Sequence, residues 1–267
     1  MEPALDLVPI DATGRRLALT RRGAGAPTVV LETGLGAESV EWEAVQRDVA
    51  TFVGTCRYDR ANRGASDPAP KPRSARDFVG DLHALLETAA IPRPYVLVGH
   101  SLGGVIVRLY AHQYPHDVAG LVLIDPMHED QFERIAPLIP GPFPGEPDAL
   151  TQFRRFWTEE WHDPMKNPEG VDFRANQAQA QAIGSLGAIP LLVLTASDFL
   201  RQAPPGDPGA ARMHQQWQEL HRELMQQSAD ARQIMVETSG HFMQREQPEV
   251  VVAAIRRMVE TIHGPAA

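Results

Sequence analysis

The sequence predicts an α/β protein whose mainly parallel sheet is covered by helices on both faces. Short, continuously apolar runs alternate along the chain with segments whose apolar residues recur at helical spacing, as expected for such a sheet. One of these runs, Tyr95-Val96-Leu97-Val98, leads directly into Gly99-His100-Ser101-Leu102-Gly103 and then into a helical segment. A turn this tight between strand and helix requires small residues beside the serine and exposes its hydroxyl above the sheet.

The expected elements begin with a hairpin. Residues 5–10 and 16–22 alternate apolar and polar, and Thr13-Gly14 between them suits a turn. Further apolar runs predict strands at 28–31, 52–58, 95–98, 121–124, 190–194 and 233–237. Helical spacing predicts helices at 39–49, from Ser74 onward, at 102–114, around Met213, Trp217, Leu220 and Leu224, and from Pro248 to about 262.

The regular alternation stops between the runs 121–124 and 190–194. The proline-rich stretch 136–145 cannot form regular helix or sheet. We expect approximately residues 127–187 to form a cap inserted into a single domain that spans residues 1–267. Seven aromatic residues crowd this segment: Phe132, Phe143, Phe153, Phe156, Trp157, Trp161 and Phe173. We expect most of them to form the core of the cap and a minority to line a ligand pocket.

Composition narrows the function classes. The net charge is −9, and the 25 Lys and Arg residues are scattered, which argues against nucleic acid and anionic membranes as partners. Cys56 is the one cysteine, so no disulfide can form within the chain, and we expect a buried inert thiol. We see no signal peptide and no apolar stretch of bilayer length, so we expect a soluble cytoplasmic protein. The oligomeric state stays open.

Ser101 and His241 are the candidate nucleophile and base. A serine hydroxyl reacts slowly at neutral pH unless a base takes its proton. That base should sit on a loop after a late strand, at the carboxyl edge of the sheet. His241 follows the run 233–237 and precedes the last helix, so it meets this requirement.

Two motifs resemble the α/β-hydrolase superfamily. The first is Gly99-His100-Ser101-Leu102-Gly103-Gly104, and the second is Tyr58 to Asp67, which resembles that family's Asp-Arg-x-Gly-x-Gly-x-Ser turn. Asn62 replaces one glycine there, a tolerable change because Asn also adopts left-handed conformations. We assign this second segment a structural role. The resemblance covers nearly the whole chain and implies an eight-stranded, mainly parallel sheet with the cap after the sixth strand.

The resemblance also implies a Ser-acid-His order, with a carboxylate that orients the imidazole. Asp198 follows the strand 190–194, in the loop where this family usually holds its acid, and we favour it. Asp125, at the end of the strand 121–124, is the rival because some family members place the acid there. The alternative interpretation of Asp125 is a turn-forming residue that binds backbone amides. Glu237 and Asp207 are weaker candidates.

Acyl transfer also requires N–H donors for the oxyanion. The amide of Leu102 directly follows the nucleophile, at the positive end of the expected helix. The second donor should come from the loop Glu32-Thr33-Gly34-Leu35-Gly36, where alignment with the family points to the amide of Leu35. Relatives often carry His-Gly where this chain has Thr33-Gly34.

The resulting prediction is a serine hydrolase that cleaves small-molecule carboxylic esters with water through an acyl-enzyme, using Ser101, His241 and Asp198 and no cofactor or metal. Amide, lactone or C–C hydrolysis and acyl transfer to an alcohol or peroxide use the same triad and stay open. Epoxide hydrolases and dehalogenases of this family carry aspartate at the elbow, so Ser101 argues against them. A non-catalytic binding protein is the alternative from another class. We expect His100 to pack or line the pocket, and His214 and His221 to lie on an exposed helix face.

Overall fold

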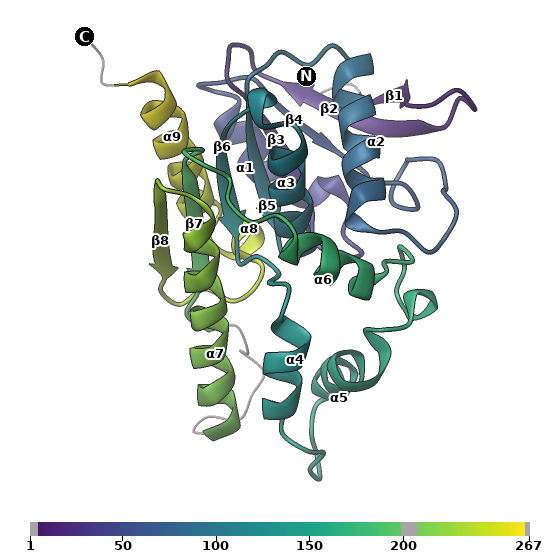
Figure 1. The fold of residues 1–267 in the computed structure, drawn as a ribbon, viewed down its shortest axis with the longest axis vertical. Helices are drawn as coiled ribbons and strands as arrows, with labels where there is room; N and C mark the ends of the chain where they lie inside the picture. The colour runs from purple at the N-terminus through teal and green to yellow at the C-terminus, as the bar shows by residue number, and fades with distance from the viewer. Residues whose placement is uncertain (1–4, 199–207, 265–267) are drawn as a thin grey trace.

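The computed structural model describes residues 5–198 and 208–264 and contains one eight-stranded sheet within them (Figure 1). The order of the strands is β1-β2-β4-β3-β5-β6-β7-β8. β2 is antiparallel to both of its neighbours, β1 and β4. The other six strands, β3 to β8, are parallel to one another. The strands are β1 (Leu5–Pro9), β2 (Arg16–Arg22), β3 (Thr28–Glu32), β4 (Thr55–Tyr58), β5 (Tyr95–His100), β6 (Val118–Ile124), β7 (Leu191–Ala196) and β8 (Ala231–Val236).

Helices cover both faces of this sheet. The helices are α1 (Glu43–Val49), α2 (Ala75–Thr88), α3 (Leu102–Gln113), α4 (Gln131–Ile135), α5 (Asp148–Arg155), α6 (Phe173–Gln181), α7 (Pro208–Leu224), α8 (Met243–Glu246) and α9 (Pro248–His263). Short 3-10 or π segments are η1 (Ser39–Trp42), η2 (Pro115–Asp117), η3 (Ala136–Leu138), η4 (Phe156–Glu160), η5 (Pro164–Lys166) and η6 (Met225–Gln227). α1, α8 and α9 pack on one face, and α2, α3 and α7 on the other.

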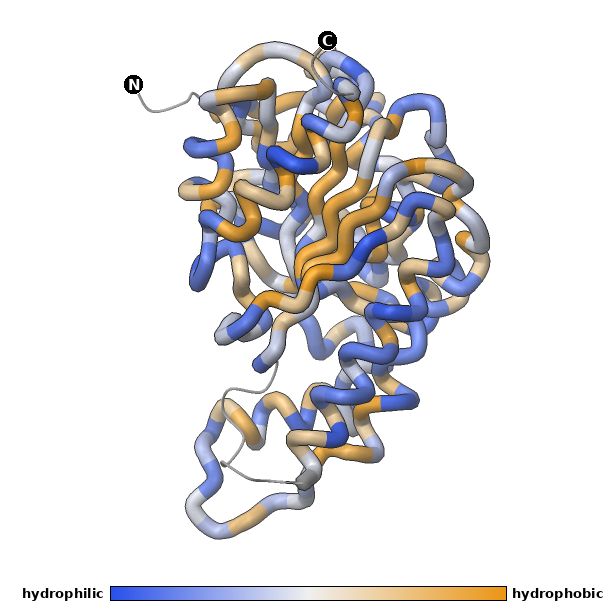
Figure 2. The backbone as a smooth tube through the Cα atoms, turned by 90° about the vertical axis from the view of Figure 1, so that its left-hand side faces the viewer, coloured by the Kyte–Doolittle hydropathy of each residue, from blue (hydrophilic) through white to orange (hydrophobic). Residues whose placement is uncertain are grey.

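The alternation of side chains along each strand divides the apolar residues between two cores. In β5, Leu97 faces the core under α2 and α3, whereas Val96 and Val98 face the core under α1 and α9. Because successive strand residues point to opposite faces, a strand buried on both sides must be apolar throughout. Figure 2 shows this as orange central strands surrounded by mixed helices.

The predicted α/β class, hairpin and strand order along the chain are confirmed, with shifts at element ends. β4 begins at Thr55 rather than at residue 52, because the amides of Phe52 and Val53 bond the carbonyl of Val49 and close the end of α1. The predicted helix 39–49 begins with the 3-10 turn η1. Asn62 has φ of +69°, the left-handed conformation expected for it.

The segment between β6 and β7, which we call the inserted segment (residues 127–187), contains α4, α5 and α6. In Figure 1 these helices lie with one end of α7 beyond the carboxyl ends of the parallel strands. Phe132 and Trp157 of this segment pack against the same core as α7. In the described residues, no helix is long and apolar enough to cross a membrane.

Candidate active site

Ser101 sits on a strained turn between β5 and α3. Its φ of +51° and ψ of −118° lie outside the regions that L-residues ordinarily adopt. The turn tolerates no side chain at its glycines: a Cβ on Gly99 would lie 2.5 Å from the carbonyl oxygen of Gly103. A Cβ on Gly103 would lie 2.8 Å from the carbonyl oxygen of Glu32. The requirement for both glycines is therefore confirmed.

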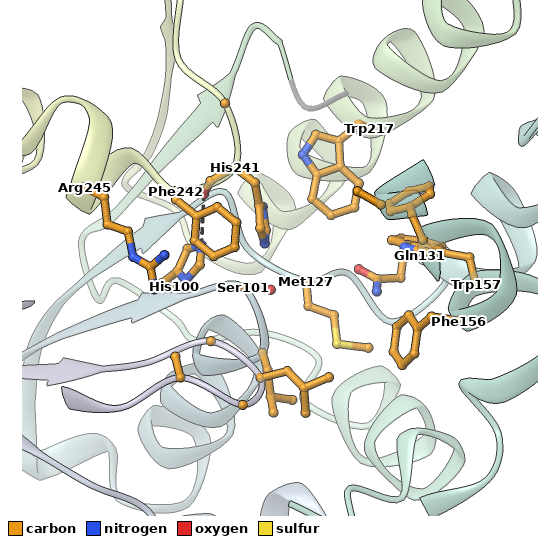
Figure 3. A pocket seen from close by; sticks show the side chains of 18 of the residues that line it. His100, Ser101, Met127, Gln131, Phe156, Trp157, Trp217, His241, Phe242 and Arg245 are labelled. Carbon is orange, nitrogen blue, oxygen red and sulfur yellow. Dashed lines mark hydrogen bonds between the residues drawn. The ribbon is translucent and has the colours of Figure 1, made fainter. Parts of the chain in front are cut away.

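His241 is oriented by Asp125, which corrects the expectation that Asp198 holds this place. His241 Nδ1 donates to Asp125 Oδ2 at 2.6 Å, a short distance typical of a charge-assisted hydrogen bond. With Nδ1 occupied, Nε2 is the nitrogen left to exchange a proton with a hydroxyl. Figure 3 shows the His241 ring pointing into the pocket on the side where Ser101 lies.

The Asp125 carboxylate is inaccessible to solvent and held by three donors. Besides His241, its Oδ1 accepts from the amide of Ala196 and from Trp217 Nε1, each at 2.9 Å. Burial alone would raise the pKa of Asp125. The hydrogen bond and charge of His241, together with the other contacts, outweigh burial and hold this pKa below its usual range. A carboxylate kept ionised beside Nδ1 can stabilise a protonated imidazole.

Asp198 lies at the pocket margin. Its side chain is 46% exposed, and its Oδ1 lies 3.8 Å from His214 Nε2. Its amide donates to the carbonyl of Ser239 at 3.1 Å, so Asp198 ties the loop after β7 to the loop that carries His241. Asp125 directly follows β6 and Asp198 follows the adjacent β7, so both stand at the same sheet edge. Glu237 is exposed, and Asp207 lies outside the described residues.

His221 is fully buried behind Asp125, so the expectation of an exposed position for it is wrong. Its Nε2 donates to the carbonyl of Pro126 at 2.8 Å, and its Nδ1 accepts from Thr195 Oγ1 at 2.9 Å. Burial lowers the pKa of His221 to about 4. The ring is therefore neutral at physiological pH and bridges the ends of β6 and β7.

His100 holds the backbone of His241. Its Nε2 donates to the carbonyl of His241 at 2.9 Å, and its Nδ1 accepts from Gln244 Nε2 at 3.2 Å. Burial lowers the pKa of His100 to about 3, assisted by the neighbouring His241. A neutral, buried His100 in the pocket wall agrees with the prediction.

Leu35 and Leu102 both line the pocket. Leu102 is the first residue of α3, where helix N–H groups lack a helical acceptor. The loop of Leu35 lies against the elbow, since a Cβ on Gly34 would be 3.3 Å from Ser101 Cβ. Both residues expected to supply the backbone donors thus line the pocket of Ser101, and their role as donors stays a prediction.

A pocket of about 650 Å³ joins these groups. Figure 3 shows Arg245 on one side of Ser101, and Phe156 and Trp157 on the other. Seven Phe and Trp side chains line the pocket: Phe132, Phe153, Phe156, Trp157, Phe173, Trp217 and Phe242. Five of them belong to the inserted segment, more than the expected minority. They pack on one another and line the cavity at the same time, as in the contact of Phe132 with Trp157 at 5.1 Å between ring centroids.

One group of potential metal ligands occurs in the described residues, at His128, Asp130 and Glu223. Arg134 Nη1 already binds both oxygens of Glu223, at 2.7 and 2.8 Å. His128 Nδ1 accepts the amide of Asp130 at 3.0 Å. A cation would have to compete with the guanidinium, so this donor set fits an ion-paired cluster better than a metal site.

Two contributors to the site carried weak signals in the sequence. The helical spacing predicted that Trp217 is buried, and a buried indole N–H requires an acceptor, which is Asp125. His221 lies four residues after Trp217, on the same helix face, so the same periodicity could have predicted its burial.

The parallel sheet and the serine on the turn between β5 and α3 are typical of α/β hydrolases, and comparison with known proteins agrees. The chain belongs to the Alpha/beta hydrolase family, whose model matches residues 29–254. It is similar to the uncharacterized protein YqjL of Bacillus subtilis, with 29% identity over 237 residues that cover 88% of this chain and 84% of that one. It is also similar to an AB hydrolase superfamily protein of Gibberella zeae, with 23% identity over 281 residues that cover 88% and 87%.

Solved structures share the fold. A thermophilic esterase from Thermogutta terrifontis superposes with a TM-score of 0.66 at 21% identity, covering 98% of this chain and 100% of that one. A Vigna radiata epoxide hydrolase mutant superposes with a TM-score of 0.69 at 14% identity, covering 97% and 99%. Because one fold hosts several chemistries, the reaction must be argued from the site.

Proposed function

We propose that this protein is a serine hydrolase that cleaves carboxylic esters through an acyl-enzyme, with Ser101 as nucleophile, His241 as base and Asp125 as the acid that orients it. The observation that carries the proposal is the 2.6 Å hydrogen bond from His241 Nδ1 to Asp125 Oδ2, on a ring that faces the pocket of Ser101. The serine at the elbow distinguishes this chain from members of the family with an aspartate nucleophile.

In the first step, Ser101 Oγ attacks the carbonyl carbon while its proton passes to His241 Nε2. The carbonyl oxygen becomes an oxyanion, which the amides of Leu35 and Leu102 stabilise. The bond to the leaving alkoxide then breaks. His241 gives its proton to that oxygen, which releases the alcohol and leaves the acyl group on Ser101.

In the second step, a water attacks the acyl carbon and gives one proton to His241. The bond from the acyl carbon to Ser101 Oγ breaks, Oγ regains the proton, and the carboxylic acid leaves. Asp125 stays ionised throughout, consistent with its lowered pKa, and stabilises the imidazolium that forms in each step.

The pocket suggests how an ester is oriented. The aromatic side, with Phe156 and Trp157, suits an apolar acyl or aryl group. On the other side, Arg245 pairs with Glu41, so charged groups border the space for the leaving alcohol. We therefore propose esters with an apolar acyl group as the substrate class.

Labelling with a fluorophosphonate tests this proposal directly. We expect the wild-type protein to react and Ser101→Ala not to. A panel of p-nitrophenyl esters of increasing chain length, with matched anilides and lactones, then defines the bond that is cleaved. Equal labelling of wild type and Ser101→Ala, or labelling of neither, would contradict the proposal.

A further inference from the structure

The guanidinium of Arg60 lies buried beneath the loop that carries Leu35. Its side chain is 1% exposed. Nη2 donates to the carbonyl oxygen of Gly34 at 2.6 Å, and Nη1 donates to the carbonyl oxygen of Thr33 at 2.8 Å. Nη1 also donates to Thr33 Oγ1 at 2.9 Å. Thr33 stands at the position where a histidine is expected in many family members. Arg60 therefore holds two successive peptide groups of this loop.

The contact with Gly34 determines the direction of the Leu35 amide. The carbonyl of Gly34 and the N–H of Leu35 belong to one peptide unit, and in a trans peptide they point in opposite directions. The cis peptides of the described residues all precede proline, so this unit is trans. Since Arg60 holds the carbonyl end, the N–H end points away from Arg60. The charge on Arg60 also polarises this peptide and strengthens its N–H as a donor.

Glu169 of the inserted segment completes the arrangement. Its two carboxylate oxygens accept from Arg60 Nε and Nη2, each at 2.7 Å, and Oε1 also accepts the amide of Gly36 at 2.6 Å. This carboxylate is fully buried. Glu32, at the end of β3, binds Arg60 Nη1 from the other side. Glu169 thus fixes both the guanidinium and the peptide that follows Leu35.

We propose that Arg60 and Glu169 are positioning residues of the oxyanion hole, which makes the inserted segment a working part of that hole. The inference rests on the proposed function, because it assigns a role to the amide of Leu35 during acyl transfer. It also changes the expectation that the segment Tyr58 to Asp67 has a structural role alone.

The test variant is Glu169→Gln, which keeps the shape of the side chain. Both oxygens of Glu169 accept hydrogen bonds from N–H groups. The side-chain NH₂ group of the glutamine would replace one of these oxygens and face an N–H donor of Arg60 or Gly36. At least one of the contacts that hold the loop around Leu35 is then lost. The matched control is Glu129→Gln, which removes a carboxylate that binds a different buried arginine, Arg108 Nη2, at 2.8 Å. Glu129 makes no hydrogen bond to the loop 33–36 among the contacts of the described residues.

We expect Glu169→Gln to lower kcat on a p-nitrophenyl ester about 10- to 100-fold, part of the loss seen when an oxyanion donor is removed. KM should change by less than about threefold, because the ground-state carbonyl depends less on this donor. Binding of a trifluoromethyl ketone, whose adduct places an oxyanion in the hole, should weaken in proportion to kcat/KM, and binding of the matched methyl ketone should not. Arg60→Lys keeps the charge but loses the fork, so it should show the same pattern.

The outcomes separate the two proposals. Activity that survives Ser101→Ala overturns the serine mechanism and this inference with it. Activity that depends on Ser101, with wild-type kcat and ketone affinity in folded Glu169→Gln, overturns the positioning role alone. An equal loss in Glu129→Gln also overturns it, because the effect would then be general damage. If thermal melting shows that Glu169→Gln does not fold, Arg60→Lys supplies the same comparison.

Discussion

Replacing Asp125 by asparagine should remove most of the activity while preserving the fold. Two donors, the amide of Ala196 and Trp217 Nε1, require an oxygen at Oδ1. The asparagine would therefore place its NH₂ group opposite His241 Nδ1. His241 would then have to accept through Nδ1 and carry its proton on Nε2, the nitrogen that must receive the proton of Ser101.

The size of this loss follows from the geometry. The wrong tautomer and the missing buried charge together should lower kcat by about 10³- to 10⁴-fold, or about 4 to 5.5 kcal/mol of transition-state stabilisation. Steady-state hydrolysis of a p-nitrophenyl ester measures kcat, and circular dichroism checks the fold. Asp198→Asn is the comparison, and its half-exposed side chain should cost less than about tenfold. A greater loss in Asp198→Asn than in Asp125→Asn would refute our assignment of the acid.

Three further predictions test the surroundings of the site. Burial lowers the folded-state pKa of His221 to about 4. Between pH 6.5 and pH 4 the unfolded chain therefore binds a proton at this residue that the folded chain does not. This difference should lower the free energy of unfolding by about 2 kcal/mol from pH 7 to pH 5. Urea unfolding at both pH values measures this change in the free energy of unfolding. We expect His221→Gln to reduce the change and His112→Gln, on an exposed surface, to leave it as in the wild type. The same change in the wild type and both variants would contradict the burial argument. Gly99→Ala should destabilise the protein by about 2 kcal/mol or more, because the added Cβ would lie 2.5 Å from a carbonyl oxygen. Gly80→Ala on α2 is the control, because a Cβ there has open space around it. In the same unfolding assay this control should be neutral or stabilising. Phe156→Ala should raise the kcat/KM of octanoate relative to butyrate esters about tenfold or more by enlarging the pocket, and an unchanged ratio would show that the acyl group binds elsewhere.

Much of the site could be predicted from local sequence. The turn around Ser101 depends on residues close to it in the sequence. At positions 99 and 103 only glycine avoids a clash with nearby backbone atoms. The apolar runs predicted the order of strands along the chain, because a strand buried on both faces requires them. His241 could be found because it follows the last strand, whose carboxyl end lies at the same sheet edge as Ser101.

Tertiary structure decided which aspartate contacts His241 and which side chains hold the loop 33–36. Asp125 and Asp198 each follow a parallel strand, and these strands are neighbours, so sequence position alone does not separate them. Burial separates them: Asp125 is inaccessible and meets the indole of Trp217, a residue 92 positions away. Glu169 reaches Arg60 across 109 positions. Contacts of such separation depend on how helices and loops pack over the sheet, which no local pattern specifies.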